Sequence, residues 1–248
     1  MSTIEERVRR PLLPDLSPHA ELALLARVLF REGYDDHDVG HITYRQADDT
    51  LLTVPVELGW NEVTASDIVR IDLDGRKVEG EWNAPPAIVL HLEFHRARPG
   101  VEVTVHQHPR FTTIWSAAGR MPGVYDQRAA TLPDSDIVFY DDYRGVVEEV
   151  AAARHAVEAM GEARCAILRN HGCFVVGETI AQAYSNAMAL EWRSRQAWMA
   201  EAIGATNEVP EIGRRSIEGV MERYAWTTPW SWEWAARREL GPPPDVLS

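Results

Sequence analysis

The chain has few cysteines, no excess of positive charge and no long apolar run. Its 248 residues include two cysteines, Cys165 and Cys173, which exclude a disulfide framework and favour free thiols in a reducing compartment. A formal net charge of −13 argues against a nucleic-acid partner, because such proteins present a basic face. No apolar stretch approaches the ~20 residues that a membrane-spanning helix needs, and residues 1–14 lack the apolar core of a signal peptide. We therefore expect a cytoplasmic protein with no membrane and no nucleic-acid partner.

Histidines stand where two predicted strands end. The run 101–105, rich in β-branched residues, leads into His106 and His108. Because alternate residues of a strand share a face, both imidazoles can reach one ion. His171 follows a second apolar strand at 165–168. Three neutral imidazoles with open coordination positions indicate a catalytic metal site rather than a closed structural one. The alternative is three histidines with unrelated surface or packing roles.

Helical and strand patterns alternate between residues 18 and 205 without a linker. Ser17 is a predicted helix cap, Gly33 a helix stop and Asp74-Gly75 the strongest hairpin signal. Antiparallel strands with helices on both faces, in one uninterrupted run, indicate a layered α/β/α domain. Predicted helices cover 18–31, 85–96, 111–118, 145–160 and 180–203, and predicted strands cover 40–45, 50–54, 69–73, 77–79, 101–105, 137–140 and the paired segment 164–177.

Four tryptophans lie close together near the C-terminus: Trp226, Trp230, Trp232 and Trp234. This density is typical of a segment that packs on another surface, because each indole has a large area to bury. We expect packing on the chain itself or on a neighbouring subunit, and an aromatic wall of a substrate pocket is the alternative. The chain is thus divided into an N-terminal arm at 1–17, a domain at 18–205 and a C-terminal extension at 206–248. The end of this extension, beyond Leu240, is expected to be extended because it holds three consecutive prolines.

A series of short motifs between residues 33 and 191 resembles the class II aldolase/adducin superfamily. In chain order they are Gly40-His41-Ile42-Thr43, 63–69, His91, 95–101, 105–109, Arg169-Asn170-His171-Gly172, Val176-Gly177 and 183–191. The resemblance implies a single α/β/α domain around a mainly antiparallel sheet. It also implies a divalent ion on His106, His108 and His171, Zn²⁺ first, with Fe²⁺ or Mn²⁺ as alternatives. The superfamily usually forms homotetramers with active sites at subunit interfaces, so we expect the same here.

The chain departs from the sugar-phosphate aldolases of this superfamily at the residues that serve the substrate. Those enzymes place a glutamate 19 residues before the first of the paired histidines, where this chain has Ala87. Pro85 and Pro86 replace small hydroxylated residues that help to hold phosphate, and His41 replaces the asparagine of a Gly-Asn phosphate loop. Because a phosphate cradle needs backbone donors and small polar side chains, we exclude sugar-phosphate aldolase as the specific activity. The dipeptide Gly40-His41 resembles instead a branch with adducin-like proteins and decarboxylases of aromatic or heterocyclic acids.

The loss of the glutamate sets the expected chemistry. Three neutral ligands leave the ion with a formal charge of about +2, which favours a bidentate anionic ligand. A 2-oxo acid, a 2-hydroxy acid or an ortho-hydroxy aromatic carboxylate meets this requirement, and both aldol cleavage and decarboxylation pass through the enolate that such binding favours. The leading hypothesis is therefore a metal-dependent carbon–carbon lyase that acts on a small, non-phosphorylated carboxylate. The alternatives are a non-haem iron oxygenase acting on an aromatic 2-oxo acid, and a non-catalytic, adducin-like interaction protein.

Four further residues are candidates for the chemistry. His91 lies one helical turn after Ala87 and is the candidate acid or base, with a structural role as the alternative. The resemblance places Tyr125 or Gln127 near a tyrosine that the aldolases donate across the subunit interface, and a packing role is the alternative for Tyr125. His41 is expected to face the substrate if it lies on the equivalent of the phosphate loop, and otherwise to stabilise a turn.

Overall fold

The computed structural model describes residues 12–36, 39–142, 147 and 149–241. Its strands are β1 (His41–Arg45), β2 (Leu51–Thr53), β3 (Val69–Ile71), β4 (Lys77–Glu79), β5 (Val103–Gln107), β6 (Ile137–Tyr140), β7 (Cys165–Leu168) and β8 (Gly172–Gly177). Over the described residues these strands form one eight-stranded sheet in the order β4-β3-β2-β1-β5-β8-β7-β6. Neighbours pair antiparallel except β6 and β7, which are parallel.

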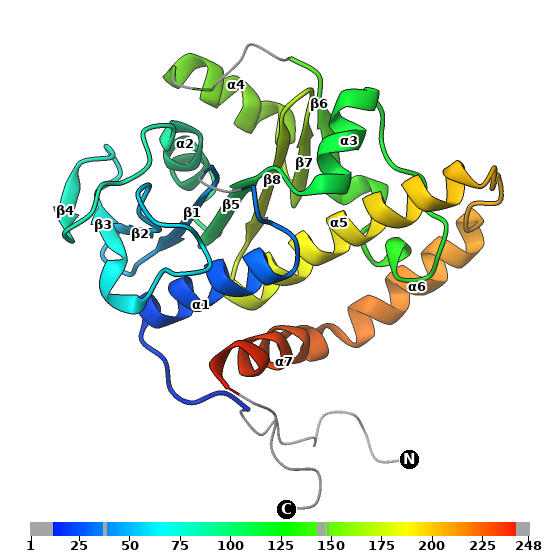
Figure 1. Ribbon diagram of the computed structural model, residues 1–248. Coiled ribbons are helices and arrows are strands. Elements are labelled where there is room, and N and C mark those ends of the chain that lie inside the picture. The colour runs from blue at the N-terminus through cyan, green and yellow to red at the C-terminus, as the bar shows by residue number, and fades with distance from the viewer. Residues whose placement is uncertain (1–11, 37–38, 143–146, 148, 242–248) are drawn as a thin grey trace, which may run out of the picture.

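Helices cover both faces of this sheet (Figure 1). They are α1 (Pro18–Arg31), α2 (Val89–Ala97), α3 (Arg110–Ala118), α4 (Val150–Met160), α5 (Ile180–Ala202), α6 (Glu211–Arg223) and α7 (Thr228–Leu240). Apolar side chains of α1 and α5 form one core with the sheet, and those of α2 and α4 form another core on the opposite face. The predicted three-layer α/β/α fold with a mainly antiparallel sheet is confirmed. Within the described ranges, no helix combines the length and the apolar character needed to cross a membrane.

The central strand β5 fixes the positions of the side chains on its two neighbouring strands, β1 and β8. All five residues of β5 are buried, because β1 and β8 pair with it on either side and helices cover both faces. The register places His106 opposite His41 of β1 and opposite Phe174 of β8. A strand buried on both sides and both faces holds its side chains rigidly, which suits a site that needs fixed geometry.

Several predicted boundaries agree with the structure. The Ser17 hydroxyl accepts a hydrogen bond from the Ala20 amide at 3.2 Å, as an N-cap does. Gly33 has φ of +98° directly after α1, a left-handed conformation that glycine adopts without strain. Asp74 and Gly75 lie in the turn that joins β3 to β4.

Two predicted helix starts were wrong. The predicted helix 85–96 begins four residues later, at Val89. Pro86 keeps Pro85 out of the helix, because a proline ring drives the residue before it out of the α region, and residues 86–88 form a turn. Ala87 therefore lies in a turn ahead of α2 rather than on the helix face of His91. The predicted helix 145–160 begins at Val150, because Glu149 has an extended backbone; residues 145, 146 and 148 lie outside the described residues.

The C-terminal segment forms two helices that the sequence analysis did not assign. Helix α7 packs on α1 and α5, so that this segment lies along the N-terminal helix (Figure 1). Trp232 is buried there, with its ring centroid 5.8 Å from that of Tyr184. Glu239 of α7 forms ion pairs with Arg27 and Arg31 of α1. Packing of the tryptophan-rich segment on its own chain therefore accounts for Trp232, whereas the division into arm, domain and extension stays a prediction.

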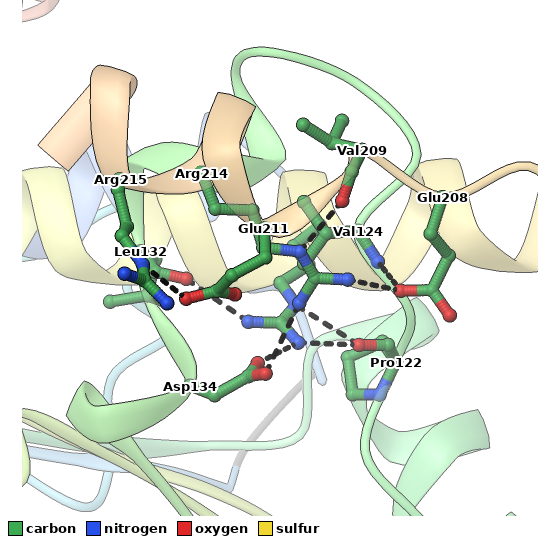
Figure 2. Close-up of polar contacts among 10 residues, drawn as sticks. Pro122, Val124, Leu132, Asp134, Glu208, Val209, Glu211, Arg214 and Arg215 are labelled. Carbon is green, nitrogen blue, oxygen red and sulfur yellow. Dashed lines mark hydrogen bonds and ion pairs between the residues drawn. The ribbon is translucent and has the colours of Figure 1, made fainter.

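Helix α6 is tied to the loop between α3 and β6 by the side chain of Arg214. Figure 2 shows Arg214 of α6 donating to the Val209 carbonyl, to Glu208 and to Asp134. Glu208 in turn accepts from the Val124 amide at 2.9 Å. Charge-assisted bonds of this kind are stronger than neutral ones, so they hold the loop that carries Tyr125 and Gln127.

Candidate metal centre

Three histidines converge at one end of the central strands. His106 lies on β5, His108 directly follows that strand, and His171 lies in the turn between β7 and β8. One nitrogen from each imidazole lies within 4.8 Å of the other two. The ring centroids are 5.0 Å apart for His106 and His108, and 4.8 Å apart for each of these with His171. The two predicted strands thus deliver their histidines to one place, as the spacing predicted.

The turn between β7 and β8 places His171. Leu168 pairs with Gly172 across this hairpin, and the His171 amide donates to the Leu168 carbonyl at 3.0 Å. Asn170 occupies the left-handed region with φ of +52°, which asparagine tolerates better than most residues. Its amide donates to the Ser116 carbonyl of α3 at 3.2 Å, which fixes the turn against that helix.

Gly172 allows the close approach of the two histidine-bearing segments. A Cβ atom at residue 172 would lie 2.4 Å from Cδ2 of His108 and 2.5 Å from the Gln107 carbonyl oxygen. Both distances are shorter than van der Waals contact, and one partner is backbone that cannot rotate away. The glycine after His171 is therefore required by packing against His108, which explains its place in the motif Arg169-Asn170-His171-Gly172.

Hydrogen bonds from Nδ1 of His106 and of His108 decide which ring nitrogen of each histidine remains available to bind an ion. His106 Nδ1 lies 2.9 Å from the Cys173 carbonyl, and His108 Nδ1 lies 2.6 Å from a carboxylate oxygen of Asp36. Because carbonyl and carboxylate oxygens only accept, both Nδ1 atoms carry a proton, which leaves Nε2 of each ring as the nitrogen that can bind an ion. Nε2 of His108 is buried without a hydrogen-bond partner. Metal-ligating histidines typically donate their second nitrogen in this way.

Burial keeps the imidazoles of His106 and His171 neutral. It lowers the pKa of His171 to about 4, and the nearby His108 adds to the shift. Burial also holds the pKa of His106 well below its usual range, with His41 and His171 acting in the same direction. A neutral imidazole binds a cation without first losing a proton. Neutral imidazoles at His106 and His171, with the orphaned buried nitrogen of His108 beside them, therefore fit a divalent transition metal ion.

A pocket of about 270 Å³ adjoins the three histidines. Its lining residues are Val39, Gly40, His41, Val56, Pro86, Ala87, Leu90, His91, His106, His108, Val147, Leu168 and His171. His41 and His91 thus share one pocket with the histidine cluster, and each keeps one buried nitrogen without a partner, Nδ1 of His41 and Nε2 of His91. No lysine or arginine occurs among the described residues that line this pocket.

Tyr125 and Gln127 lie away from this pocket in the same chain. The Tyr125 hydroxyl donates to Glu201 of α5 at 3.3 Å, and the Gln127 side chain is exposed. Neither contributes to the pocket lining of its own chain. A role for either residue in the pocket of a neighbouring subunit stays a prediction.

Asp36 is a residue of this centre that the sequence analysis missed. It lies 72 residues before His108, in an irregular segment ahead of β1, and no local pattern links the two. The one available signal was indirect, because a histidine that binds metal needs an acceptor for its other nitrogen.

Comparison with known proteins agrees with this fold. A family model described as class II aldolase and adducin N-terminal domain matches residues 20–198. A 3,4-dihydroxyphthalate decarboxylase from Arthrobacter keyseri is 29% identical over 228 residues, which cover 86% of this chain and 91% of that protein. A 4-hydroxy-3-prenylphenylpyruvate oxygenase/4-hydroxy-3-prenylbenzoate synthase from Streptomyces roseochromogenus subsp. oscitans is 29% identical over 199 residues, covering 77% and 71%.

A solved structure resembles the whole fold. L-fuculose 1-phosphate aldolase from Glaciozyma antarctica PI12 superposes with a TM-score of 0.79 at 20% identity, covering 92% of this chain and 94% of that one. Curated relatives include both decarboxylases and aldolases, which supports an enzyme of the metal-dependent lyase kind. The chain belongs to the class II aldolase and adducin family.

Proposed function

We propose that the protein is a divalent-metal-dependent carbon–carbon lyase acting on a non-phosphorylated carboxylate, with an aromatic hydroxy acid as the first candidate substrate. The observation that carries this proposal is the histidine cluster beside a pocket that has Ala87 where the aldolases carry a glutamate. His106, His108 and His171 would hold the ion, Zn²⁺ first, with Fe²⁺ or Mn²⁺ as alternatives. When bound, such an ion supplies a Lewis acid that stabilises charge developing on the oxygens of a chelating acid.

The pocket walls favour a flat apolar substrate over a sugar phosphate. Val56, Leu90 and Leu168 contribute apolar surface, and Pro86 has no amide hydrogen to offer a phosphate. A phosphate dianion in this pocket would find no cationic side chain among the described lining residues. An aromatic ring fits such walls, and its carboxylate and hydroxyl groups can serve as chelating atoms. The similarity to a 3,4-dihydroxyphthalate decarboxylase supports decarboxylation as the reaction to test first.

His91 and His41 are the proposed groups that handle the substrate's protons and polar atoms. Both are largely buried, and their ring centroids are 5.7 Å apart. Burial lowers the pKa of His41 to about 4, so that it is neutral near pH 7. We propose His91 as the acid or base and His41 as a substrate-binding residue. In a homotetramer, Tyr125 or Gln127 of a neighbouring subunit would complete the pocket.

One relative favours a second candidate, a non-haem iron oxygenase. The Streptomyces protein named as an oxygenase covers 77% of this chain, and three histidines can also hold Fe²⁺ with coordination positions open for O₂. This alternative predicts that the reaction consumes oxygen, whereas the lyase needs none. A non-catalytic interaction protein, the third possibility, would gain nothing from neutral imidazoles facing a pocket.

A reconstitution assay tests the proposal. Protein stripped of metal should be reloaded with Zn²⁺, Fe²⁺ or Mn²⁺ under argon and offered 3,4-dihydroxyphthalate, 2,3-dihydroxybenzoate and L-fuculose 1-phosphate. We expect anaerobic release of CO₂ from an aromatic acid that depends on added metal, with no cleavage of the sugar phosphate. Turnover that requires O₂ would favour the oxygenase, and efficient cleavage of the sugar phosphate would contradict the proposal.

A further inference from the structure

Four polar side chains form an unbroken hydrogen-bonded chain behind the pocket. It runs from His91 on α2 through Thr104 on β5 and Thr43 on β1 to His95, one turn further along α2. All four side chains are at most 1% exposed. The distances are 2.6 Å from His91 Nδ1 to the Thr104 hydroxyl, 2.5 Å between the two hydroxyls, and 2.7 Å from the Thr43 hydroxyl to His95 Nε2. His95 Nδ1 lies 3.2 Å from the Val101 carbonyl, where the chain ends.

The carbonyl at the far end sets the direction of the first two hydrogen bonds. A carbonyl oxygen only accepts, so His95 Nδ1 carries a proton and donates it to Val101. Burial lowers the pKa of His95 to about 4, which leaves the ring neutral and its Nε2 without a proton. That nitrogen must accept, and the neighbouring Thr43 hydroxyl is its donor.

The donors of the two remaining hydrogen bonds, Thr104 to Thr43 and His91 to Thr104, follow from this assignment. Thr43 has one hydroxyl hydrogen, which is used on His95, so the hydrogen between the two hydroxyls belongs to Thr104. Thr104 has then used its own hydrogen, and the contact with His91 Nδ1 requires the proton to be on that nitrogen. In the neutral ring the other nitrogen, Nε2, is left with a lone pair. Hydrogen bonds arranged head to tail also strengthen one another.

We infer that Thr104, Thr43 and His95 are positioning residues that hold His91 with its proton on Nδ1, so that Nε2 faces the pocket as an acceptor that selects acids with a hydroxyl group. Nε2 of His91 is buried, has no partner in the protein, and belongs to a residue that lines the pocket. Phe174 packs against the ring, with its ring centroid 4.9 Å from that of His91. A hydroxyl group of the substrate can therefore donate a hydrogen bond to Nε2 of His91. An ether oxygen has no hydrogen to donate, and its lone pairs would repel the lone pair of this nitrogen.

The selection of a hydroxyl acid rests on the proposed function, whereas the position of the proton on His91 does not. The test has two parts for this reason. Neutron diffraction from crystals exchanged into D₂O should locate deuterium on Nδ1 of His91, on the Thr104 hydroxyl towards Thr43, and on Nδ1 of His95. Deuterium on Nε2 of His91 would overturn the inference whether or not the protein proves to be a lyase.

The second part measures binding to the zinc-loaded protein by calorimetry. The probes are 3,4-dihydroxybenzoate and 3,4-dimethoxybenzoate, which share the ring and the carboxylate, but the second carries methyl groups in place of the hydroxyl hydrogens. We expect a preference of at least tenfold for the dihydroxy acid in the natural protein and in Thr104→Ser, which keeps a hydroxyl. The preference should fall to within about threefold in the isosteric Thr104→Val, because the remaining contact of His91 Nδ1, with the Thr43 hydroxyl at 3.5 Å, is too long to hold the proton on that nitrogen.

The matched control is Thr53→Val. This variant removes a buried hydroxyl from strand β2, and Thr53 is not one of the four hydrogen-bonded side chains. It should keep the tenfold preference. An equal loss of preference in Thr53→Val and Thr104→Val would indicate general loosening of the sheet and overturn the inference. An undiminished preference in Thr104→Val would equally overturn it. Absence of lyase turnover, with both binding results as expected, would refute the proposed function and leave the positioning chain intact.

Discussion

Replacement of His171 by alanine is expected to remove the bound metal and to lower turnover by roughly 10³-fold while the protein stays folded. Loss of an outer hydrogen-bond partner of a metal ligand already costs about 10–100-fold, and loss of a ligand itself should cost more. The fold should survive because His171 lies in a hairpin turn outside the apolar cores. Metal content per chain, turnover and the thermal midpoint of the metal-free protein should be measured together.

His155→Ala is the matched control for this experiment. His155 lies on the exposed side of α4 and bonds to Tyr140, away from the pocket. It should retain metal and activity. Full metal content in both His171→Ala and His108→Ala would refute the ligand assignment, and unfolding of His171→Ala alone would point to a structural role for the turn.

Replacement of Ala87 by glutamate is expected to lower activity on an aromatic hydroxy acid by roughly 100-fold. Ala87 lines the pocket beside the three histidines, so the new carboxylate would lie where a chelating substrate must bind. Two like charges about 5 Å apart repel by about 3 kcal/mol at an effective dielectric constant of 20, equivalent to roughly 100-fold in affinity. Metal binding should tighten at the same time, because a fourth and charged ligand becomes available. Steady-state kinetics and competition with a metal chelator measure the two effects.

Ala87→Gln separates charge from bulk, since glutamine has the size of glutamate without its charge. It should cost less activity than Ala87→Glu and leave metal affinity nearly unchanged. We have proposed that the ion, held by neutral ligands alone, keeps its full charge to bind the anionic substrate. If Ala87→Glu instead raised activity on the unphosphorylated acid, this proposal would be wrong.

Much of the fold was predictable because local chemistry and tertiary packing agree. Ser17 caps the helix that it precedes, Asp74-Gly75 turns the hairpin, and β-branched residues form the strand that leads to His106. The start of α2 was wrong because the prolines at 85 and 86 were interpreted as the first helical residues, whereas residues 86–88 form a turn and the helix begins at Val89. Helices α6 and α7 were missed because neither packs chiefly on the sheet: α6 has no buried residue, and α7 packs on α1 and α5.

The three histidines of the candidate site were predictable from the sequence, whereas the residues that hold them in place were not. His106 and His108 could be placed together from strand periodicity, and His171 joined them because its strand is a close neighbour in the sheet. Their partners could not be foreseen, because Asp36 and Cys173 reach the rings through tertiary contacts without a local pattern. The chain of hydroxyls behind His91 is of the same kind, since it depends on the register between β1 and β5.

Anomalous diffraction from crystals grown with zinc, recorded on both sides of the zinc absorption edge, tests the central claim most directly. The account predicts one peak per chain, about 2.0–2.1 Å from Nε2 of His106, from Nε2 of His108 and from one ring nitrogen of His171, with no carboxylate of the same chain as a fourth ligand. A zinc peak at another place would contradict the account. A zinc peak bound by only one or two of these three histidines would also contradict it.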